Sequence, residues 1–118
     1  MQVAILDHHF SDQEILVNKI FEHCLCPIKK NNVFISQYND NKKFIESLYH
    51  GDDYQIVYLE VSSIDSNTFE AMKELLPYCT IILITANEDY IPFNNFEVLL
   101  KPYDSQRIID TLVFFSFL

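Results

Sequence analysis

Short apolar runs alternate along the chain with longer segments in which apolar residues recur every three or four positions. The apolar runs have the unbroken character of strands that are buried on both faces, and they predict strands at residues 3–6, 32–37, 56–59, 81–84 and 98–100. The periodic segments predict helices that follow the capping residues Ser11 and Asp40, and helices that begin near residues 67 and 105.

This alternation of strand and helix predicts an α/β domain with a parallel sheet that helices cover on both faces. In such sheets, binding sites form where the carboxyl ends of the strands finish side by side. The candidate site residues are the polar residues at those ends: Asp7, His8, Glu60, Thr85 and Lys101.

The composition narrows the class of protein. The 118 residues fit one domain spanning 1–118, and a net charge of −9 disfavours direct binding to nucleic acid or to an anionic membrane. A single glycine, Gly51, excludes the glycine-rich loops that cradle nucleotide phosphates. No apolar run is long enough to span a membrane, so we expect a soluble, cytoplasmic domain.

Cysteines and histidines raise the question of a metal site. The cysteines are Cys24, Cys26 and Cys79. They lack the paired spacing of a zinc site, so reduced thiols are expected. His8 and His9 could hold a transition metal together with Asp7 and Glu60, because imidazole and carboxylate ligands suit zinc or manganese. The more ordinary interpretation places these histidines in a solvated loop beside a helix cap.

Four segments carry the candidate site residues: VAILDHH, QIVYLEV, IILITA and VLLKP. In order and spacing they resemble the response-regulator receiver domains of bacterial two-component signalling, over nearly the whole chain. The resemblance implies a flavodoxin-like doubly wound fold with strand order 2-1-3-4-5. It also implies that Asp7 helps to hold Mg²⁺ and that Thr85 and Lys101 contact phosphoryl oxygens. Glu60 stands where receivers carry the aspartate that accepts the phosphoryl group.

Two departures from the family disfavour phosphorylation. His8 replaces the second acidic residue after the first strand, which leaves Asp7 and Glu60 to bind Mg²⁺ weakly at most. Glu60 is one methylene longer than aspartate, which moves its carboxylate by about 1.5 Å from the position that in-line transfer requires. Glu60 could instead mimic a phosphorylated aspartate permanently, or simply pair with Lys101.

Further departures affect the surface that receivers use for output. Ile64 stands where a proline is expected, Thr68 where a small turn residue is expected, and Val98 where receivers carry a switch aromatic. The segment between the fourth and fifth strands is also short and has Pro92 in its middle. The helix expected there is therefore predicted to be shortened or absent.

These features together predict a non-enzymatic pseudo-receiver that needs no cofactor and works without phosphorylation. Its expected partners are a second copy of the chain, an effector domain or a histidine kinase. One alternative is a phosphotransfer-competent receiver that is phosphorylated on Glu60 or on another carboxylate such as Asp65. A further alternative is a domain that binds a small ligand at the strand ends.

The last predicted helix should mediate self-association. Its apolar residues continue past the core positions as Phe114, Phe115, Phe117 and Leu118. At about 100° per residue they cannot all face the sheet. Burying one Phe contributes about 2 kcal/mol, and two-fold symmetry counts each contact twice. Sedimentation should therefore show a micromolar dimer that Phe115→Asp weakens without loss of fold. A monomer at high protein concentration would contradict this expectation.

Overall fold

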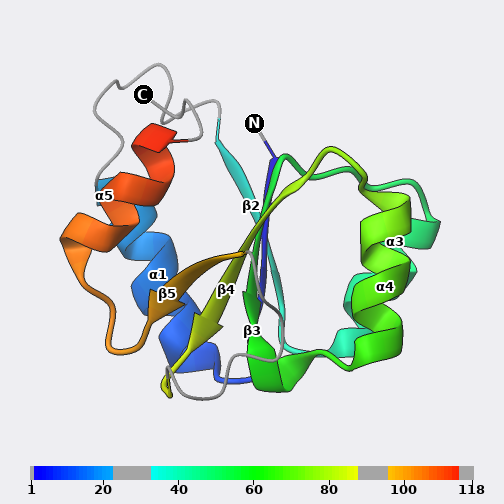
Figure 1. Ribbon diagram of the computed structural model, residues 1–118, viewed down its shortest axis with the longest axis horizontal. Helices are drawn as coiled ribbons and strands as arrows, with labels where there is room; N and C mark the ends of the chain where they lie inside the picture. The colour runs from blue at the N-terminus through cyan, green and yellow to red at the C-terminus, as the bar shows by residue number, and fades with distance from the viewer. Residues whose placement is uncertain (1, 23–32, 88–95, 115–118) are drawn as a thin grey trace.

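Five parallel strands form a single sheet (Figure 1), and their order, β2-β1-β3-β4-β5, confirms the predicted flavodoxin-like doubly wound fold. The computed structural model describes residues 2–22, 33–87 and 96–114, with 112–114 described by their backbone alone. Its elements are β1 (Gln2–Leu6), α1 (Phe10–Glu22), β2 (Phe34–Tyr38), α3 (Asn41–Tyr49), β3 (Ile56–Glu60), the 3₁₀ turn η1 (Val61–Ser63), α4 (Ser66–Leu75), β4 (Thr80–Thr85), β5 (Glu97–Leu100) and α5 (Ser105–Phe114).

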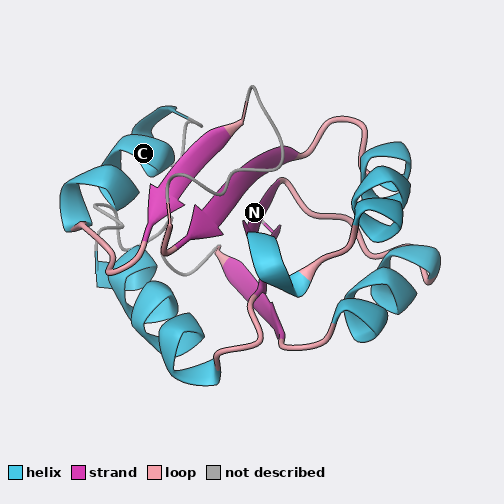
Figure 2. Ribbon diagram, turned by 60° about the horizontal axis from the view of Figure 1, so that its bottom comes forward, coloured by secondary structure: helices cyan, strands magenta, loops and turns pink. Residues whose placement is uncertain are grey.

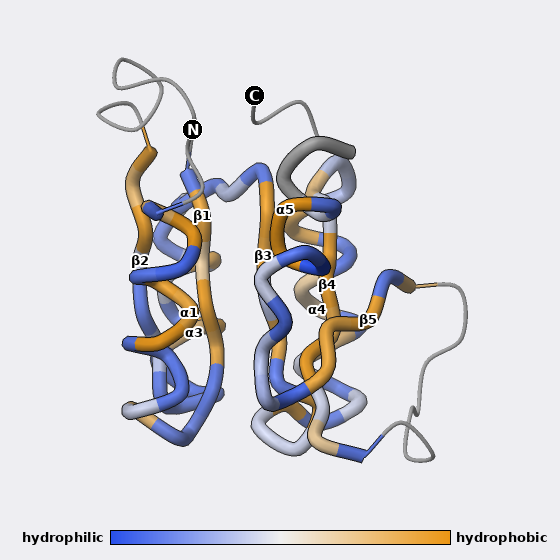
Figure 3. The backbone as a smooth tube through the Cα atoms, turned by 90° about the vertical axis from the view of Figure 1, so that its left-hand side faces the viewer, coloured by the Kyte–Doolittle hydropathy of each residue, from blue (hydrophilic) through white to orange (hydrophobic). Residues whose placement is uncertain are grey.

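Helices cover both faces of the sheet. α1 and α5 pack together on one face, and α3 and α4 pack together on the other (Figure 1). The central strands between these layers are coloured mainly as hydrophobic in Figure 3. Since both faces of the sheet are covered, polar side chains can gather at the strand ends.

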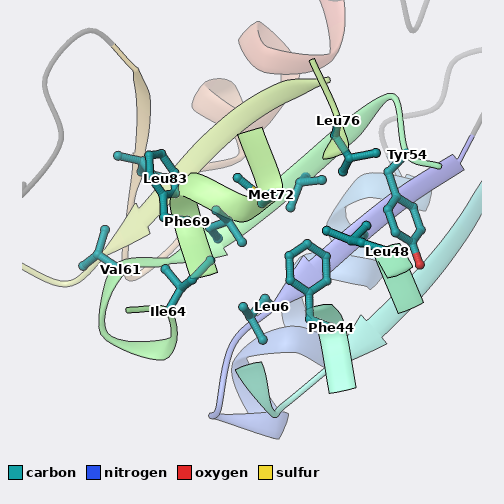
Figure 4. Close-up of a cluster of buried hydrophobic side chains, with 13 residues drawn as sticks. Leu6, Phe44, Leu48, Tyr54, Val61, Ile64, Phe69, Met72, Leu76 and Leu83 are labelled. Atoms are coloured by element: carbon teal, nitrogen blue, oxygen red, sulfur yellow. The ribbon is translucent and has the colours of Figure 1, made fainter. Parts of the chain in front are cut away.

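Side chains alternate along the central strands between two hydrophobic cores. Val3 and Ile5 of β1 belong to the core under α1 and α5, whereas Ala4 and Leu6 belong to the core under α3 and α4. The second core is shown in Figure 4 and includes Leu6, Phe44, Leu48, Tyr54, Val61, Ile64, Phe69, Met72, Leu76 and Leu83. Because successive side chains of a strand point to opposite faces, the same strands contribute to both hydrophobic cores.

Local hydrogen bonds determine where two of the helices begin. The Asp40 side chain accepts the Lys42 backbone N–H at 2.8 Å and caps α3, as predicted. The prediction that Ser11 caps the first helix is wrong, because α1 begins at Phe10. The carboxylate of Asp7 accepts the His9 backbone N–H at 2.9 Å, and this contact turns the chain into the helix before Ser11 is reached.

Three predictions concern residues outside the described ranges: the shortened helix before β5, the thiols of Cys24 and Cys26, and the apolar side chains beyond Thr111. Within the described ranges, Cys79 is a free thiol. Burial, with a smaller contribution from Asp53, raises the pKa of Cys79 to about 12, so this thiol stays protonated. No helix in the described part of the chain has the length and apolar character to cross a membrane.

Candidate functional site

The carboxyl ends of the strands meet at one edge of the sheet, which Figure 2 brings toward the viewer. In the strand register Glu60 lies beside Ile84, and Thr85 lies beside Leu100. The backbone N–H of Lys101 donates to the Thr85 carbonyl at 2.9 Å. We use the term strand-end site for the residues gathered here: Asp7, His8, Asp12, Glu60, Thr85 and Lys101.

Lys101 is held between two carboxylates. Its Nζ lies 2.7 Å from Oδ2 of Asp7 and 2.8 Å from Oδ2 of Asp12. Asp7 is fully buried, so its charge needs a close counterion. Burial by itself lowers the pKa of Lys101, but the hydrogen bonds and charges of Asp12 and Asp7 outweigh it and raise this pKa above its ordinary value. The ammonium group is therefore committed to an internal ion-pair network.

Asp12 is a site residue that the sequence analysis misses. It lies in the first turn of α1 and is about one-third exposed. A helix that directly follows a strand starts at the sheet edge where the strand ends, so an acidic residue in its first turn lies near the strand-end side chains. The position of Asp12 so soon after the first strand is therefore the feature of the sequence that could have identified it.

Gln13 is a second residue of the site that the sequence analysis misses. It is buried, and its Nε2 donates to the backbone carbonyls of Asp7 and Tyr38 at 2.6 Å and 2.7 Å. These bonds fasten α1 to the ends of β1 and β2. The available signal is its spacing, since Gln13 occupies the same helical face as the buried Leu16 and Ile20.

Glu60 is bound by the turn that follows its own strand. Its Oε2 accepts hydrogen bonds from the hydroxyls of Ser62 and Ser63 at 2.6 Å and 2.7 Å. Among the ion pairs of the described residues, none joins Glu60 to Lys101, so the predicted pairing of these two residues is wrong. The physical reason is competition: η1 presents two hydroxyls to Glu60, while Asp7 and Asp12 take the lysine.

The pKa of Glu60 reflects these hydrogen bonds. Burial by itself raises the pKa, but the hydroxyls of Ser62 and Ser63, with a smaller contribution from the charge of Lys101, lower it below its ordinary value. The side chain is consequently an ionised, hydrogen-bonded carboxylate at neutral pH.

Two imidazole rings lie beside the carboxylates. The Nδ1 of His8 is 2.7 Å from the Ser63 hydroxyl and 3.4 Å from Oε2 of Glu60. The Nδ1 of His9 is 3.3 Å from Oδ1 of Asp7. Both histidines are exposed, so solvent reaches the site from their side.

Thr85 is buried, and its hydroxyl is engaged by the turn after β4. It donates to the Asn87 carbonyl at 3.0 Å and accepts the Asn87 N–H at 3.1 Å. The hydroxyl thus closes its own loop. Nearby, burial raises the pKa of Tyr103 above its usual range, and the negative charges of Asp7, Asp12 and Glu60 add to this effect.

The site does not fit Mg²⁺, the cation that the family resemblance implies. Mg²⁺ needs near-octahedral oxygen ligands. At Asp7, Oδ1 accepts the His9 N–H and Oδ2 faces Lys101. Oε2 of Glu60 already accepts two hydroxyls, and His8 offers nitrogen instead of oxygen.

We therefore expect millimolar Mg²⁺ to leave the thermal midpoint of unfolding unchanged, because Asp7 and Glu60 alone offer too few oxygen ligands for near-octahedral coordination. Differential scanning fluorimetry with and without MgCl₂ measures this directly. A stabilisation of several degrees that Asp7→Ala abolishes would falsify the expectation.

The lowered pKa of Glu60 leads to a prediction about acid stability. A carboxylate whose folded pKa lies below its unfolded value, ordinarily 4.5, contributes stability that is present above that value and lost as pH falls through the folded pKa. In urea titrations from about pH 5 to about pH 3, the free energy of unfolding should fall more steeply for wild type than for Glu60→Gln. Glu74→Gln, at an exposed position of α4, is the matched control. Equal slopes for wild type and Glu60→Gln would contradict the assignment.

Comparisons with known proteins identify the fold. No protein-family model and no curated protein matches the sequence. A two-component transcriptional regulator AraC from Clostridium phytofermentans is similar in structure, with a TM-score of 0.73 and 19% identity over 98% of this chain and 90% of that chain. The signal receiver domain of an HD domain-containing protein from Pseudomonas fluorescens has a TM-score of 0.73 and 16% identity, over 97% and 85% of the two chains.

A CheY-like response regulator receiver domain protein from Methanospirillum hungatei is also similar, with a TM-score of 0.67 and 18% identity, over 97% of this chain and 92% of that chain. These identities are low, while the structural agreement extends over nearly the whole chain. The strand order and the gathering of polar residues at the strand ends agree with the same architecture. The chain therefore has the fold of a response-regulator receiver domain.

Proposed function

We propose that this chain is a receiver domain of two-component signalling that works without phosphorylation, as a non-enzymatic module that contacts other domains. The observation that carries the proposal is the position of Lys101. Its ammonium lies 2.7 Å from Asp7 and 2.8 Å from Asp12, so both of its close partners are carboxylates of the chain itself.

Phosphoryl transfer at this site would require several of the observed contacts to break. Lys101 would have to leave two carboxylates in order to reach phosphoryl oxygens. Glu60 would have to release the hydroxyls of Ser62 and Ser63 to act as a nucleophile. Catalysis of phosphoryl transfer depends on groups that are already placed to contact the phosphoryl group. Here Lys101 and Glu60 instead contact other groups of the chain.

The same contacts weigh against Glu60 as a permanent phosphate mimic. A mimic would place its charge on the groups that normally receive the phosphoryl oxygens. The hydrogen bonds of Glu60 are instead with Ser62 and Ser63, and the Thr85 hydroxyl is bonded to Asn87. We therefore favour a site that is stabilised by its own ion pairs.

A receiver domain that is not phosphorylated could still act by contacting a partner. One of the similar structures is described as a transcriptional regulator, and another is the receiver domain of an HD domain-containing protein. By analogy, we propose that this domain contacts an effector domain or a second copy of itself in the cytoplasm. This part of the proposal rests on likeness of fold and on the apolar C-terminal sequence.

The rival function is a receiver that accepts phosphate on another carboxylate, such as Asp65. Asp65 is exposed and caps α4 by accepting the Thr68 backbone N–H at 2.7 Å. This hydrogen bond is the main cause that lowers the pKa of Asp65. Phosphorylation there would remove the cap, a cost that the proposed function avoids.

Acetyl phosphate separates the two functions. We expect intact-mass spectrometry of the chain, after incubation with acetyl phosphate and Mg²⁺, to show no added phosphoryl group, while a phosphorylation-competent receiver treated in parallel is labelled. Stoichiometric labelling of the wild type would overturn the proposal, and peptide mapping would then decide between Glu60 and Asp65.

Restoring the family's acidic residues should recover phosphorylation only in part. In the variant His8→Asp/Glu60→Asp, the carboxylates regain the expected length and number, but Lys101 keeps its partner Asp12 and Val98 still replaces the switch aromatic. Labelling well below one phosphoryl group per chain is the expected result by the same mass measurement. Adding Asp12→Ala should raise it, because this change frees the lysine. Complete labelling of the double variant would show that Asp12 does not restrain Lys101.

A further inference from the structure

Two adjacent histidines lie at the strand-end site, and the proposed function does not use them. The rings of His8 and His9 have centroids 3.9 Å apart, and their side chains are 46% and 55% exposed. They directly follow Asp7, whose carboxylate is fully buried. One ligand atom from each of these three residues lies within 4.8 Å of the other two.

We infer that Asp7, His8 and His9 form a binding site for a divalent transition-metal cation of the zinc class. Zinc binds histidine nitrogen and carboxylate oxygen at about 2.0–2.2 Å, which places neighbouring ligand atoms of a tetrahedral site about 3.4 Å apart. The Nδ1 of His9 and Oδ1 of Asp7 are already separated by 3.3 Å. The third ligand would be His8, whose ligand atom lies within 4.8 Å of the other two. Rotation of this exposed imidazole ring can shorten those distances to the value that zinc requires.

The charge of the site favours a cation. The strand-end site holds three carboxylates, those of Asp7, Asp12 and Glu60, and one ammonium, that of Lys101, which pairs with Asp7 and Asp12. Burial raises the pKa of Tyr103, and the negative charges of the same three carboxylates raise it further. Oδ2 of the fully buried Asp7 contacts the Lys101 ammonium at 2.7 Å, and Oδ1 accepts the His9 backbone N–H. A carboxylate offers about four acceptor positions, so these two contacts leave Asp7 with acceptor capacity.

The ligand types select the class of metal. Imidazole nitrogen favours zinc and its neighbours in the transition series over Mg²⁺ and Ca²⁺. Ser63 and Glu60 lie at Nδ1 of His8, at 2.7 Å and 3.4 Å. A hydrogen bond from Nδ1 to these groups would leave Nε2 for the metal, as in the carboxylate–histidine–metal arrangements that orient imidazole ligands. The substitution of His8 for an acidic residue thus changes the cation preference of the site.

The inference rests on the proposed function in one respect: it assumes that the strand-end site does not bind Mg²⁺ or a phosphoryl group. The two ideas are measured separately. Metal uptake is read by calorimetry, whereas phosphoryl transfer is read by mass. A chain that takes up neither zinc nor phosphate would overturn this inference and leave the proposed function in place.

The test is a titration of the full, tag-free chain with ZnCl₂ by isothermal calorimetry. We expect one equivalent of zinc to bind, with millimolar Mg²⁺ unable to compete. His8→Gln and His9→Gln should each weaken zinc binding at least tenfold. His50→Gln removes an exposed histidine at the end of α3 and is the matched control, which should leave the affinity unchanged.

Cobalt absorption distinguishes this site from the cysteines. Co²⁺ bound by imidazole and carboxylate gives visible d–d bands without the strong thiolate charge-transfer band in the near ultraviolet. We expect the first spectrum in wild type and its loss in the variant His8→Gln/His9→Gln. The absence of stoichiometric zinc uptake, a thiolate band, or full zinc affinity in a double variant that unfolds like wild type would each overturn the inference.

Discussion

The buried negative charge of Asp7 is the constraint on which the strand-end site depends. Burying a carboxylate costs several kcal/mol unless counterions and hydrogen bonds compensate for it. The ammonium of Lys101 lies 2.7 Å from one oxygen, and the His9 backbone N–H donates to the other at 2.9 Å. These two contacts join the end of β1 to the residue after β5 and to the start of α1, so that one charge positions elements from both ends of the chain.

The hydrogen bonds of the other site residues depend on this ion pair. Because Lys101 serves Asp7 and Asp12, Glu60 is left to the hydroxyls of Ser62 and Ser63 in the adjoining turn. The fold of a receiver domain is thus combined with a strand-end site whose charged groups contact groups of the same chain. A fold does not by itself determine a function, because function depends on the site that the fold carries.

The sequence predicts the strands well, because strands buried on both faces must be apolar throughout, as 56–59 and 81–84 are. It also predicts which strand-end residues gather, since parallel strands end at one edge. The partners of those residues are less predictable. Asp12 and Gln13 enter the site through the direction in which α1 leaves the sheet, and the turn at Ser62 and Ser63 has no periodic signal. Ser11 is a residue type that often caps helices, but the Asp7 carboxylate accepts the His9 N–H and the helix begins before Ser11.

A double-mutant cycle on Asp7 and Lys101 tests most directly whether this ion pair organises the site. The free energy of unfolding would be measured for wild type, Asp7→Asn, Lys101→Met and the double variant, with the exposed pair Glu70–Lys73, 3.0 Å apart, as the matched control cycle. We expect a coupling energy of about 2 kcal/mol for Asp7 and Lys101 and at most about 0.5 kcal/mol for the control. Additive effects of Asp7→Asn and Lys101→Met, with a coupling energy no larger than that of the control pair, would contradict the account.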